Sequence, residues 1–364
     1  MHFITSLPCF QRNPTEIIPR SLSISCSVLP PSYRSFTILH EGGHKETVLH
    51  VGGNFQNVIH TIHPRLSASH FVTVEVFSRM ISIAKTFTHL EELSLTNHII
   101  SDDFYGILSH FPHLQSFKIS SCHFKTESSI SPGNFIALDP LKKLTLRNIT
   151  YRYKPNFAVL VAAPGLTSLC FDRTSGDCLP VSGDTYKKLT FLQVYDTPGW
   201  TPQLSQQDTV MVALTIANHS PLVETLILDI PLRFPPPPNG QIHLPRSLKK
   251  YRGSADLLLK TISCMELQQI LVAEIFNGHT DLDSVFLSIS RSMLGLQQLA
   301  VVLENWDKSL PDALPHLQNL GNLTHIWISV GKPVPVRNSS ICVRIFYGGA
   351  RRSPRIFWIA FCWV

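Results

Sequence analysis

Hydrophobic residues recur along most of the chain in a short phrase, with apolar residues at its first, fourth and sixth positions. The segment 90–122 holds two copies, LEELSL and LQSFKI, whose first residues, Leu90 and Leu114, are 24 residues apart. Polar residues and a second apolar-periodic segment lie between the copies. Because side chains alternate along a strand, the fourth and sixth residues share one face. The pattern predicts a short strand with a buried face, followed by a return segment.

Ten copies of the phrase follow one another, and nine of them keep an apolar residue at all three positions. Their first residues are Leu90, Leu114, Leu141, Leu166, Leu189, Val223, Leu248, Leu267, Leu296 and Leu323. The spacings are 24, 27, 25, 23, 34, 25, 19, 29 and 27 residues. The second copy continues to Cys122 and matches the leucine-rich-repeat template L-x-x-L-x-L-x-x-N/C, with aromatic or β-branched substitutions. We expect an α/β fold, an irregular leucine-rich-repeat solenoid with parallel strands on one face and helices and loops on the other.

Apolar periodicity and capping residues predict helices in several return segments. These are Ser101–His110 with Ser101 as N-cap, Gln206–Ala217, Ala255–Met265, Asp281–Met293 and Leu310–Leu317. The segment LPRSLKKYRG departs from the pattern, because Gly253 replaces the apolar residue at the sixth position. A glycine inside a strand weakens it, so we expect a short or kinked strand there.

Three regions differ in composition. Residues 1–40 contain five prolines, which exclude a long helix, and we expect them to be irregular. Residues 41–330 hold the repeats, preceded by β-like runs at 36–39, 47–51 and 71–74 and by an amphipathic helix over 74–88. Residues 331–364 match no repeat and end in the apolar run IFWIAFCWV. This tail is a cap packed on the last repeat, a gene-model artefact such as a read-through intron, or a membrane anchor, although nine residues are too few to span a bilayer.

The net charge of +6 comes entirely from the tail, where six Lys and Arg residues follow position 331 without any Asp or Glu. Residues 1–331 are formally neutral, whereas a domain that binds phosphates carries its own basic face. We therefore expect no binding of nucleic acid.

Eight cysteines are widely spaced and form no C-x-x-C pair. Reduced and mostly buried thiols are expected, which favours a cytoplasmic or nuclear location. The N-terminus lacks the basic region of a signal peptide, and no run of about 18 apolar residues occurs. No membrane association is expected.

Catalytic motifs of the types G-x-S-x-G, H-E-x-x-H and G-x-x-x-x-G-K-[ST] do not occur in the chain. Asp102-Asp103 and Asp281-x-Asp283 suit helix starts better than a catalytic carboxylate pair. We expect no catalysis, no cofactor and no metal, and an enzyme without a recognisable motif remains the alternative from another class.

Binding is expected on the strand face, which presents the third, fifth and seventh residues of each phrase. These positions mix polar side chains with aromatic ones, as protein-binding surfaces do. The candidate binding residues are Lys118, Thr145, Arg147, Asp172, Gln193, Tyr195, Asp229, Leu271, Val302 and Trp327. After Leu267 the outward positions become apolar, so a partner or the tail is expected to cover them.

The region 40–330 resembles the repeat portion of fungal, basidiomycete-type F-box proteins. The resemblance rests on phrases such as THLEELSLTN, FPHLQSFKISSC and LPRSLKKYRG. The segment NPTEII at 13–18 resembles the opening of an F-box, and CSVLPPSY and FTI resemble its closing part. The segment from Pro14 to Ile38 has only 25 residues, about half of a three-helix box, so the box is truncated or degenerate. The resemblance implies a substrate receptor of a ubiquitin ligase that binds the ligase's adaptor subunit; an adaptor unrelated to ubiquitin is the alternative.

Overall fold

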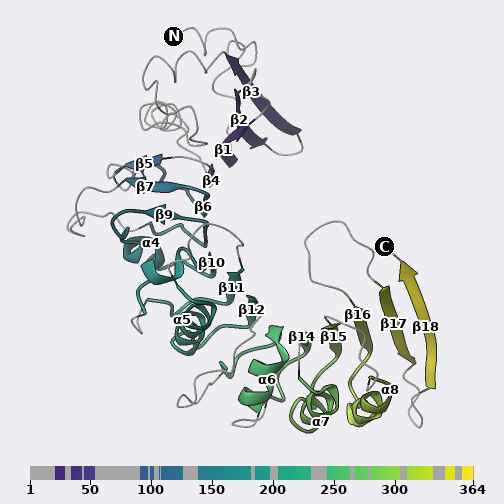
Figure 1. Ribbon diagram of the computed structural model, residues 1–364. Helices are drawn as coiled ribbons and strands as arrows, with labels where there is room; N and C mark the ends of the chain where they lie inside the picture. The colour runs from purple at the N-terminus through teal and green to yellow at the C-terminus, as the bar shows by residue number, and fades with distance from the viewer. Residues whose placement is uncertain are drawn as a thin grey trace. The chain divides into compact units, whose positions relative to one another are not determined.

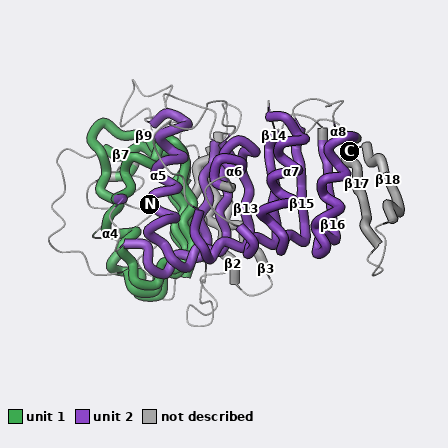
Figure 2. The backbone as a smooth tube through the Cα atoms, turned by 90° about the horizontal axis from the view of Figure 1, so that it is seen from below, with its two compact units in different colours: residues 1–180, 199–203 green, residues 181–198, 204–364 purple. Residues whose placement is uncertain are grey.

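The protein is described by a computed structural model that divides into two compact units. Unit 1 comprises residues 1–180 and 199–203, and unit 2 comprises residues 181–198 and 204–364 (Figure 2). The structure describes residues 21–28, 34–42, 45–53, 91–96, 99–101, 106, 108–125, 138–181, 185–196, 204–230, 244–262, 267–277, 280–303, 310–330, 341–348 and 355–363.

Unit 1 is built on a sheet whose strand order is β10-β8-β6-β4-β1-β2-β3. Four strands from the repeats run parallel, and they are β4 (Glu92–Thr96), β6 (Ser116–Ser120), β8 (Lys143–Arg147) and β10 (Ser168–Asp172). A second parallel sheet holds β5 (Ile99–Ser101), β7 (His123–Lys125) and β9 (Thr150–Tyr151). The helical turns α4 (Ala158–Val161) and η1 (Gly176–Cys178) complete the described part.

Unit 2 continues the same alternation of strand and return segment. Its parallel strands are β11 (Phe191–Tyr195), β12 (Thr225–Asp229), β13 (Lys250–Ser254), β14 (Val272–Asn277), β15 (Gln298–Leu303) and β16 (His325–Val330). The α/β class with parallel strands, expected from the repeated phrase, is confirmed. Consecutive strands of the sequence are neighbours in the sheet, so each repeat contacts chiefly the repeats before and after it.

Burial alternates along the strands as the phrase requires. In β4 the residues at the fourth and sixth positions, Leu93 and Leu95, are buried, and their neighbours are exposed or half-buried. The first positions are buried as well, and they are Leu114, Leu141, Leu166, Leu189, Val223, Leu248, Leu296 and Leu323. The core is therefore a stack of three apolar residues per repeat, extended by the return segments.

Adjacent repeats are joined by one backbone contact that recurs in both units. The carbonyl of Glu91 accepts hydrogen bonds from the amides of Gln115 (2.7 Å) and Ser116 (2.9 Å), and the Gln115 carbonyl then accepts from Lys142 and Lys143. The carbonyls that accept two amides in this way belong to Glu91, Gln115, Lys142, Thr190, Glu224, Lys249, Leu271 and Gln297. Each is the second residue of its phrase, so this contact fixes the register of every following strand.

The register corrects one of the ten phrase assignments. Leu271 stands at the second position, because its carbonyl accepts the paired amides of the next repeat. The first position is therefore Ile270, not Leu267, and the phrase is ILVAEI, with Ala273 and Ile275 buried. Leu267 is buried in the preceding turn, where its carbonyl accepts the amide of Ile270. Ile270 lies 22 residues after Leu248 and 26 before Leu296, which is closer to the other spacings than 19 and 29.

The return segments of unit 2 contain helices where periodicity predicts them (Figure 1). They are α5 (Gln206–Asn218), α6 (Ala255–Ile262), α7 (Leu282–Ser292), α8 (Leu310–Ala313) and the 3-10 helix η2 (Leu314–Asn319). Helix α7 packs against α6, α8 and η2, so these helices form a layer on one side of the strands. In unit 1, Ser101 ends β5 instead of capping a helix. Gly106 and Leu108, within the predicted helix 101–110, are helical, and residues 102–105 and 107 lie outside the described residues.

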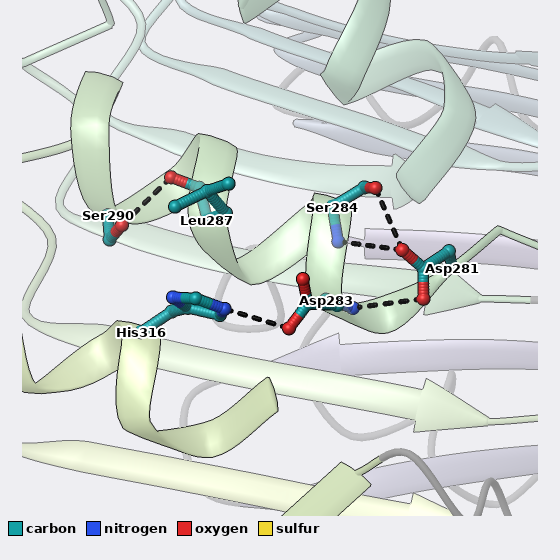
Figure 3. Close-up of polar contacts among 6 residues, drawn as sticks. All are labelled: Asp281, Asp283, Ser284, Leu287, Ser290 and His316. Carbon is teal, nitrogen blue, oxygen red and sulfur yellow. Dashed lines mark hydrogen bonds and ion pairs between the residues drawn. The ribbon is translucent and has the colours of Figure 1, made fainter. Parts of the chain in front are cut away.

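Asp281 is the N-cap of helix α7, as its sequence predicts (Figure 3). The Asp281 carboxylate accepts hydrogen bonds from the amides of Asp283 and Ser284 and from the Ser284 hydroxyl (2.8 Å). These bonds hold the pKa of the Asp281 carboxyl below its ordinary value, so the N-cap is ionised at neutral pH. His316 Nε2 lies 2.8 Å from Asp283 Oδ1, which joins η2 to the first turn of α7.

Strand β13 is not short, contrary to the first of the two expectations from Gly253. It spans five residues and pairs over all of them with β14. Tyr251, at the fourth position, is fully buried, and its hydroxyl lies where a side chain on Gly253 would begin, 2.5 Å from an ideal Cβ. That hydroxyl donates to the carbonyl of Ser254 (3.1 Å). One large side chain therefore fills the volume of two smaller ones.

The ends of the described chain add antiparallel strands. The strand β1 (Ser21–Val28) pairs parallel with β4, and β2 (Arg34–Gly42) and β3 (Lys45–Gly53) follow as antiparallel neighbours. Much of the region 1–40, expected to be irregular, is therefore strand. The β-like runs at 36–39 and 47–51 agree with β2 and β3, whereas 71–74 and the helix over 74–88 lie outside the described residues.

The C-terminal tail is also paired with the repeats. The strands β17 (Ile341–Gly348) and β18 (Arg355–Trp363) form an antiparallel pair, and β17 pairs antiparallel with β16. This pairing corresponds to the first alternative for the tail, a segment that packs on the last repeat. In the part of the chain that the structure describes, no helix combines the length and apolar character needed to cross a bilayer.

The tight stacking of turns generates a first prediction. An ideal Cβ on Gly295 would collide with the carbonyl oxygen of Gln268 in the preceding turn, so Gly295→Ala should lower the free energy of unfolding by about 1–3 kcal/mol. Gly321 occupies the turn of the next repeat with nothing within 4 Å of its Cβ position, so Gly321→Ala is the matched control. Urea denaturation of both variants measures the difference, and equal stabilities would contradict this packing.

The second sheet of unit 1 generates a pH-dependent prediction. Burial lowers the pKa of His123 from its ordinary value of 6.5, and its Nδ1 lies 3.0 Å from Thr150 Oγ1. The unfolded chain therefore binds this proton more readily than the folded chain. The contribution of neutral His123 to the free energy of unfolding is complete above pH 6.5 and is lost as the pH falls through the pKa of the folded state.

The melting temperature of the wild type should accordingly fall relative to that of His123→Gln as the pH is lowered from about 7 to about 5. His110→Gln, at an exposed position of the same unit, controls for the substitution itself. Parallel melting curves for the wild type and His123→Gln across this range would refute the burial effect.

Candidate functional site

The strand face of unit 2 carries a connected set of polar side chains, called here the Arg252 network and consisting of Gln193, Tyr195, Asp229, Arg252 and Glu274. The Tyr195 hydroxyl donates to Gln193 Oε1 (3.0 Å), and Gln193 Nε2 donates to Asp229 Oδ2 (2.9 Å). Arg252 Nε lies 2.7 Å from Asp229 Oδ1, and its Nη1 lies 3.5 Å from Glu274 Oε1. The network therefore runs across four adjacent strands, from β11 to β14.

Parallel register brings these residues together. Tyr195 lies opposite Asp229 on the neighbouring strand, and Arg252 lies opposite Glu274. The guanidinium carbon of Arg252 lies over the ring of Phe276, 5.3 Å from its centroid, so the two side chains form a cation–π contact. The side chains of Arg252, Asp229 and Glu274 are 35%, 21% and 29% exposed, so the network is ordered but remains in reach of a partner.

The Arg252–Asp229 contact is an ion pair without a hydrogen bond between the two atoms that face each other. Arg252 Nε and Asp229 Oδ1 are both buried, and neither has a hydrogen-bond partner among the described residues, although the two atoms form an ion pair. The N–H bond of Arg252 is thus not aligned with the oxygen that it faces. Charge attraction holds this contact, and the directional hydrogen bonds of the network belong to Gln193 and Tyr195.

Apolar and aromatic side chains continue the strand face beyond the network. His325 and Trp327 stack at 5.3 Å between ring centroids and 10° between ring planes. Trp327 lies opposite Ala300, and Val302 lies opposite Ser329, and all four are half-buried. The third, fifth and seventh positions of β14 are Val272, Glu274 and Phe276. The run of apolar outward residues expected after Leu267 is therefore interrupted by Glu274.

The sequence-predicted residues divide into three groups. Gln193, Tyr195 and Asp229 join in the network, and Val302 and Trp327 lie on the same face. In unit 1, Lys118 is exposed on β6, and Thr145 and Arg147 are half-buried on β8. Two placements are wrong, and they are those of Leu271 and Asp172. The part that the other residues play in binding stays a prediction.

Leu271 precedes β14, and its backbone joins two repeats, since its carbonyl accepts the amides of Gln297 and Gln298. Starting this phrase at Leu267 instead of Ile270 also left Glu274 and Phe276 out of the predicted strand face. The corrected phrase ILVAEI places both on it. Arg252 was missed because its phrase is the one broken by Gly253. The opposite charges at equivalent positions of successive repeats are the signal that points to the network.

Asp172 ends β10 but is fully buried, so it is not part of the exposed strand face. Its Oδ2 accepts the amide of Asn148 (2.5 Å) from the preceding repeat. Its Oδ1 accepts the amides of Thr174 and Ser175 and both of their hydroxyls, at 2.6–3.2 Å. A buried carboxylate with this many donors shapes the turn after the strand, which outward alternation alone does not reveal.

The buried thiol of Cys178 is not suited to nucleophilic chemistry. Burial raises the pKa of Cys178, and its sulfur lies 3.3 Å from Asp177 Oδ1, so the thiol stays protonated. The same carboxylate accepts the hydroxyl of Tyr151 (2.5 Å), whose pKa is also raised by burial. Cys122, Cys170 and Cys178 are buried thiols. The described residues contain no group of three His, Cys, Asp or Glu arranged to hold a metal ion.

Comparison with known proteins adds no family assignment: no protein-family model matches the chain, and no curated protein matches its sequence.

The burial of Asp172 generates a stability prediction. Asp172→Ala leaves several buried donors without an acceptor, so the free energy of unfolding should fall by about 3 kcal/mol. Asp172→Asn keeps one acceptor oxygen and should lose less, and Asp139→Ala, at an exposed turn position, should change little. Urea denaturation gives the three values. A wild-type stability for Asp172→Ala would assign this carboxylate to the surface after all.

Proposed function

We propose that the chain is a leucine-rich-repeat solenoid that acts as a non-catalytic scaffold for protein recognition through its strand face. The observation that carries this proposal is the Arg252 network beside Phe276 and Trp327. Its side chains hold one another in place before a partner arrives, which reduces the entropy cost of binding. Arg, Tyr and Trp are also the residues that most often dominate the energy of protein interfaces.

The repeat architecture of the proposal is supported by three regularities. The phrase positions alternate between core and surface, the strands are parallel and in register, and one backbone contact links successive repeats. Cys122, the residue that matches the ninth template position, is fully buried, and its thiol lies 3.6 Å from the carbonyl of Leu95 in the preceding repeat. A contact between this position and the neighbouring turn is what the ninth template position, Asn or Cys, is expected to provide.

The specific version of the proposal is the substrate-receptor part of an F-box-type ubiquitin-ligase subunit. Within the span compared with an F-box, residues 21–28 and 34–42 are strands, whereas an F-box consists of helices. This favours the version without ligase docking, an adaptor whose partner is recruited by the repeats alone.

Affinity capture with strand-face variants tests the proposal. Trp327→Ala should reduce the recovery of specific partners at least about tenfold, because truncating an aromatic anchor costs about 2 kcal/mol or more. Leu294→Ala, which removes an exposed apolar side chain from a turn of the same unit, should leave recovery unchanged. Circular dichroism confirms that both variants fold.

Identical recovery by Trp327→Ala, Leu294→Ala and the wild type would refute recognition through the strand face of unit 2. The recovered material also separates the two versions of the proposal. The adaptor subunit of the ubiquitin ligase should be missing from it, and its recovery with full-length protein would restore the ligase version.

A further inference from the structure

The strand face of unit 1 differs in charge from that of unit 2. Hydroxyl side chains occupy half of its outward positions, and they are Ser94, Thr96, Ser116, Ser120, Thr145 and Ser168. Among them stand the exposed lysines Lys118 and Lys143, and half-buried Arg147 ends β8. Within the described part of unit 1, neither lysine forms an ion pair. The middle of this face is therefore cationic, although residues 1–331 are neutral as a whole.

Two outward positions of these strands carry acidic residues, and neither residue forms an ion pair with these lysines in the described part of unit 1. Asp172 is fully buried, and its carboxylate accepts backbone amides and the hydroxyls of the following turn. Glu92 is exposed on β4 opposite Ser116, so it lies two strands from Lys143 and is a diagonal neighbour of Lys118. The positive charge of Lys118 and Lys143 is thus available to a partner.

Register sets the spacing of the two lysines. Lys118 lies opposite Thr145, so Lys143 is its diagonal neighbour on the adjacent strand. Strand spacing and residue rise place diagonal Cα atoms about 8 Å apart. In an extended peptide, alternate residues are about 6.6 Å apart and project to the same side. The two cations therefore match acidic side chains at alternate positions of an extended chain, and the surrounding hydroxyls are suited to its polar groups.

We propose that the strand face of β4, β6, β8 and β10 binds an extended acidic segment of a protein partner, with carboxylates at alternate positions held by Lys118 and Lys143. This inference deepens the proposed function and rests on it, since it names the chemistry of the partner for one part of the strand face. Charge complementarity gives the interaction its selectivity and its dependence on salt.

Fluorescence anisotropy with a labelled ten-residue peptide of alternating Glu and Ser tests this directly on the full chain. The peptide should bind, binding should weaken with added salt, and the double variant Lys118→Glu/Lys143→Glu should weaken it at least about tenfold. Lys125→Glu provides a control of the same charge type on β7, an exposed strand position in the second sheet of unit 1. It should change the affinity by less than about twofold.

Two peptides separate spacing from bulk charge. A peptide with the same number of glutamates at every fourth position should bind more weakly, and one with Gln in place of Glu should not bind. Equal binding of the two acidic peptides, or equal losses for the Lys125 and Lys118/Lys143 variants, would reduce the effect to non-specific electrostatics and overturn the proposal. Tighter binding of an oligothymidylate that depends on the same lysines would overturn it in favour of nucleic acid.

The outcome is distinguishable from that of the proposed function. Absence of peptide binding rejects the acidic partner. Loss of captured proteins with Trp327→Ala, a residue of unit 2, would in that case leave recognition through the strand face standing. If Trp327→Ala has no effect while the peptide binds through Lys118 and Lys143, the recognition surface is confined to unit 1.

Discussion

A backbone carbonyl that accepts two amides from the next repeat is the contact on which the rest of the architecture depends. It recurs from Glu91 to Gln297 at the second position of the phrase, immediately before each strand begins. Because it fixes where these strands start, it also fixes which of their side chains enter the core and which line the strand face. A shift of one residue would exchange the two faces, so the apolar pattern and this contact reinforce each other.

The phrase of three apolar residues was sufficient to predict the α/β class, the parallel strands and most return helices of unit 2. The phrase was insufficient where one large side chain fills the space of two. Tyr251 fills the space beside Gly253, so a break in the pattern left the strand intact. Near Leu267, two overlapping frames satisfy the same apolar pattern, and only backbone pairing selects Ile270. The apolar pattern predicts which residues are buried, whereas register depends on backbone hydrogen bonds, which the identity of the residues does not reveal.

The candidate site was predictable to a similar degree and for similar reasons. Outward alternation identified Gln193, Tyr195 and Asp229, because each occupies a regular strand position. It could not anticipate that Asp172 turns inward, since donors from two repeats converge on that carboxylate. Nor did it find Arg252, whose importance arises from neighbours on adjacent strands rather than from residues nearby in the chain.

These hydrogen bonds between repeats also make changes in the return segments independent of changes in the strands. Since register is set at the start of each strand, the length of a return segment has no influence on the order of side chains across the sheet. The segment between β11 and β12 already carries the additional helix α5 without disturbing their pairing. Insertions of foreign sequence should therefore be accommodated between strands, while the composition of the strands evolves independently toward a new ligand.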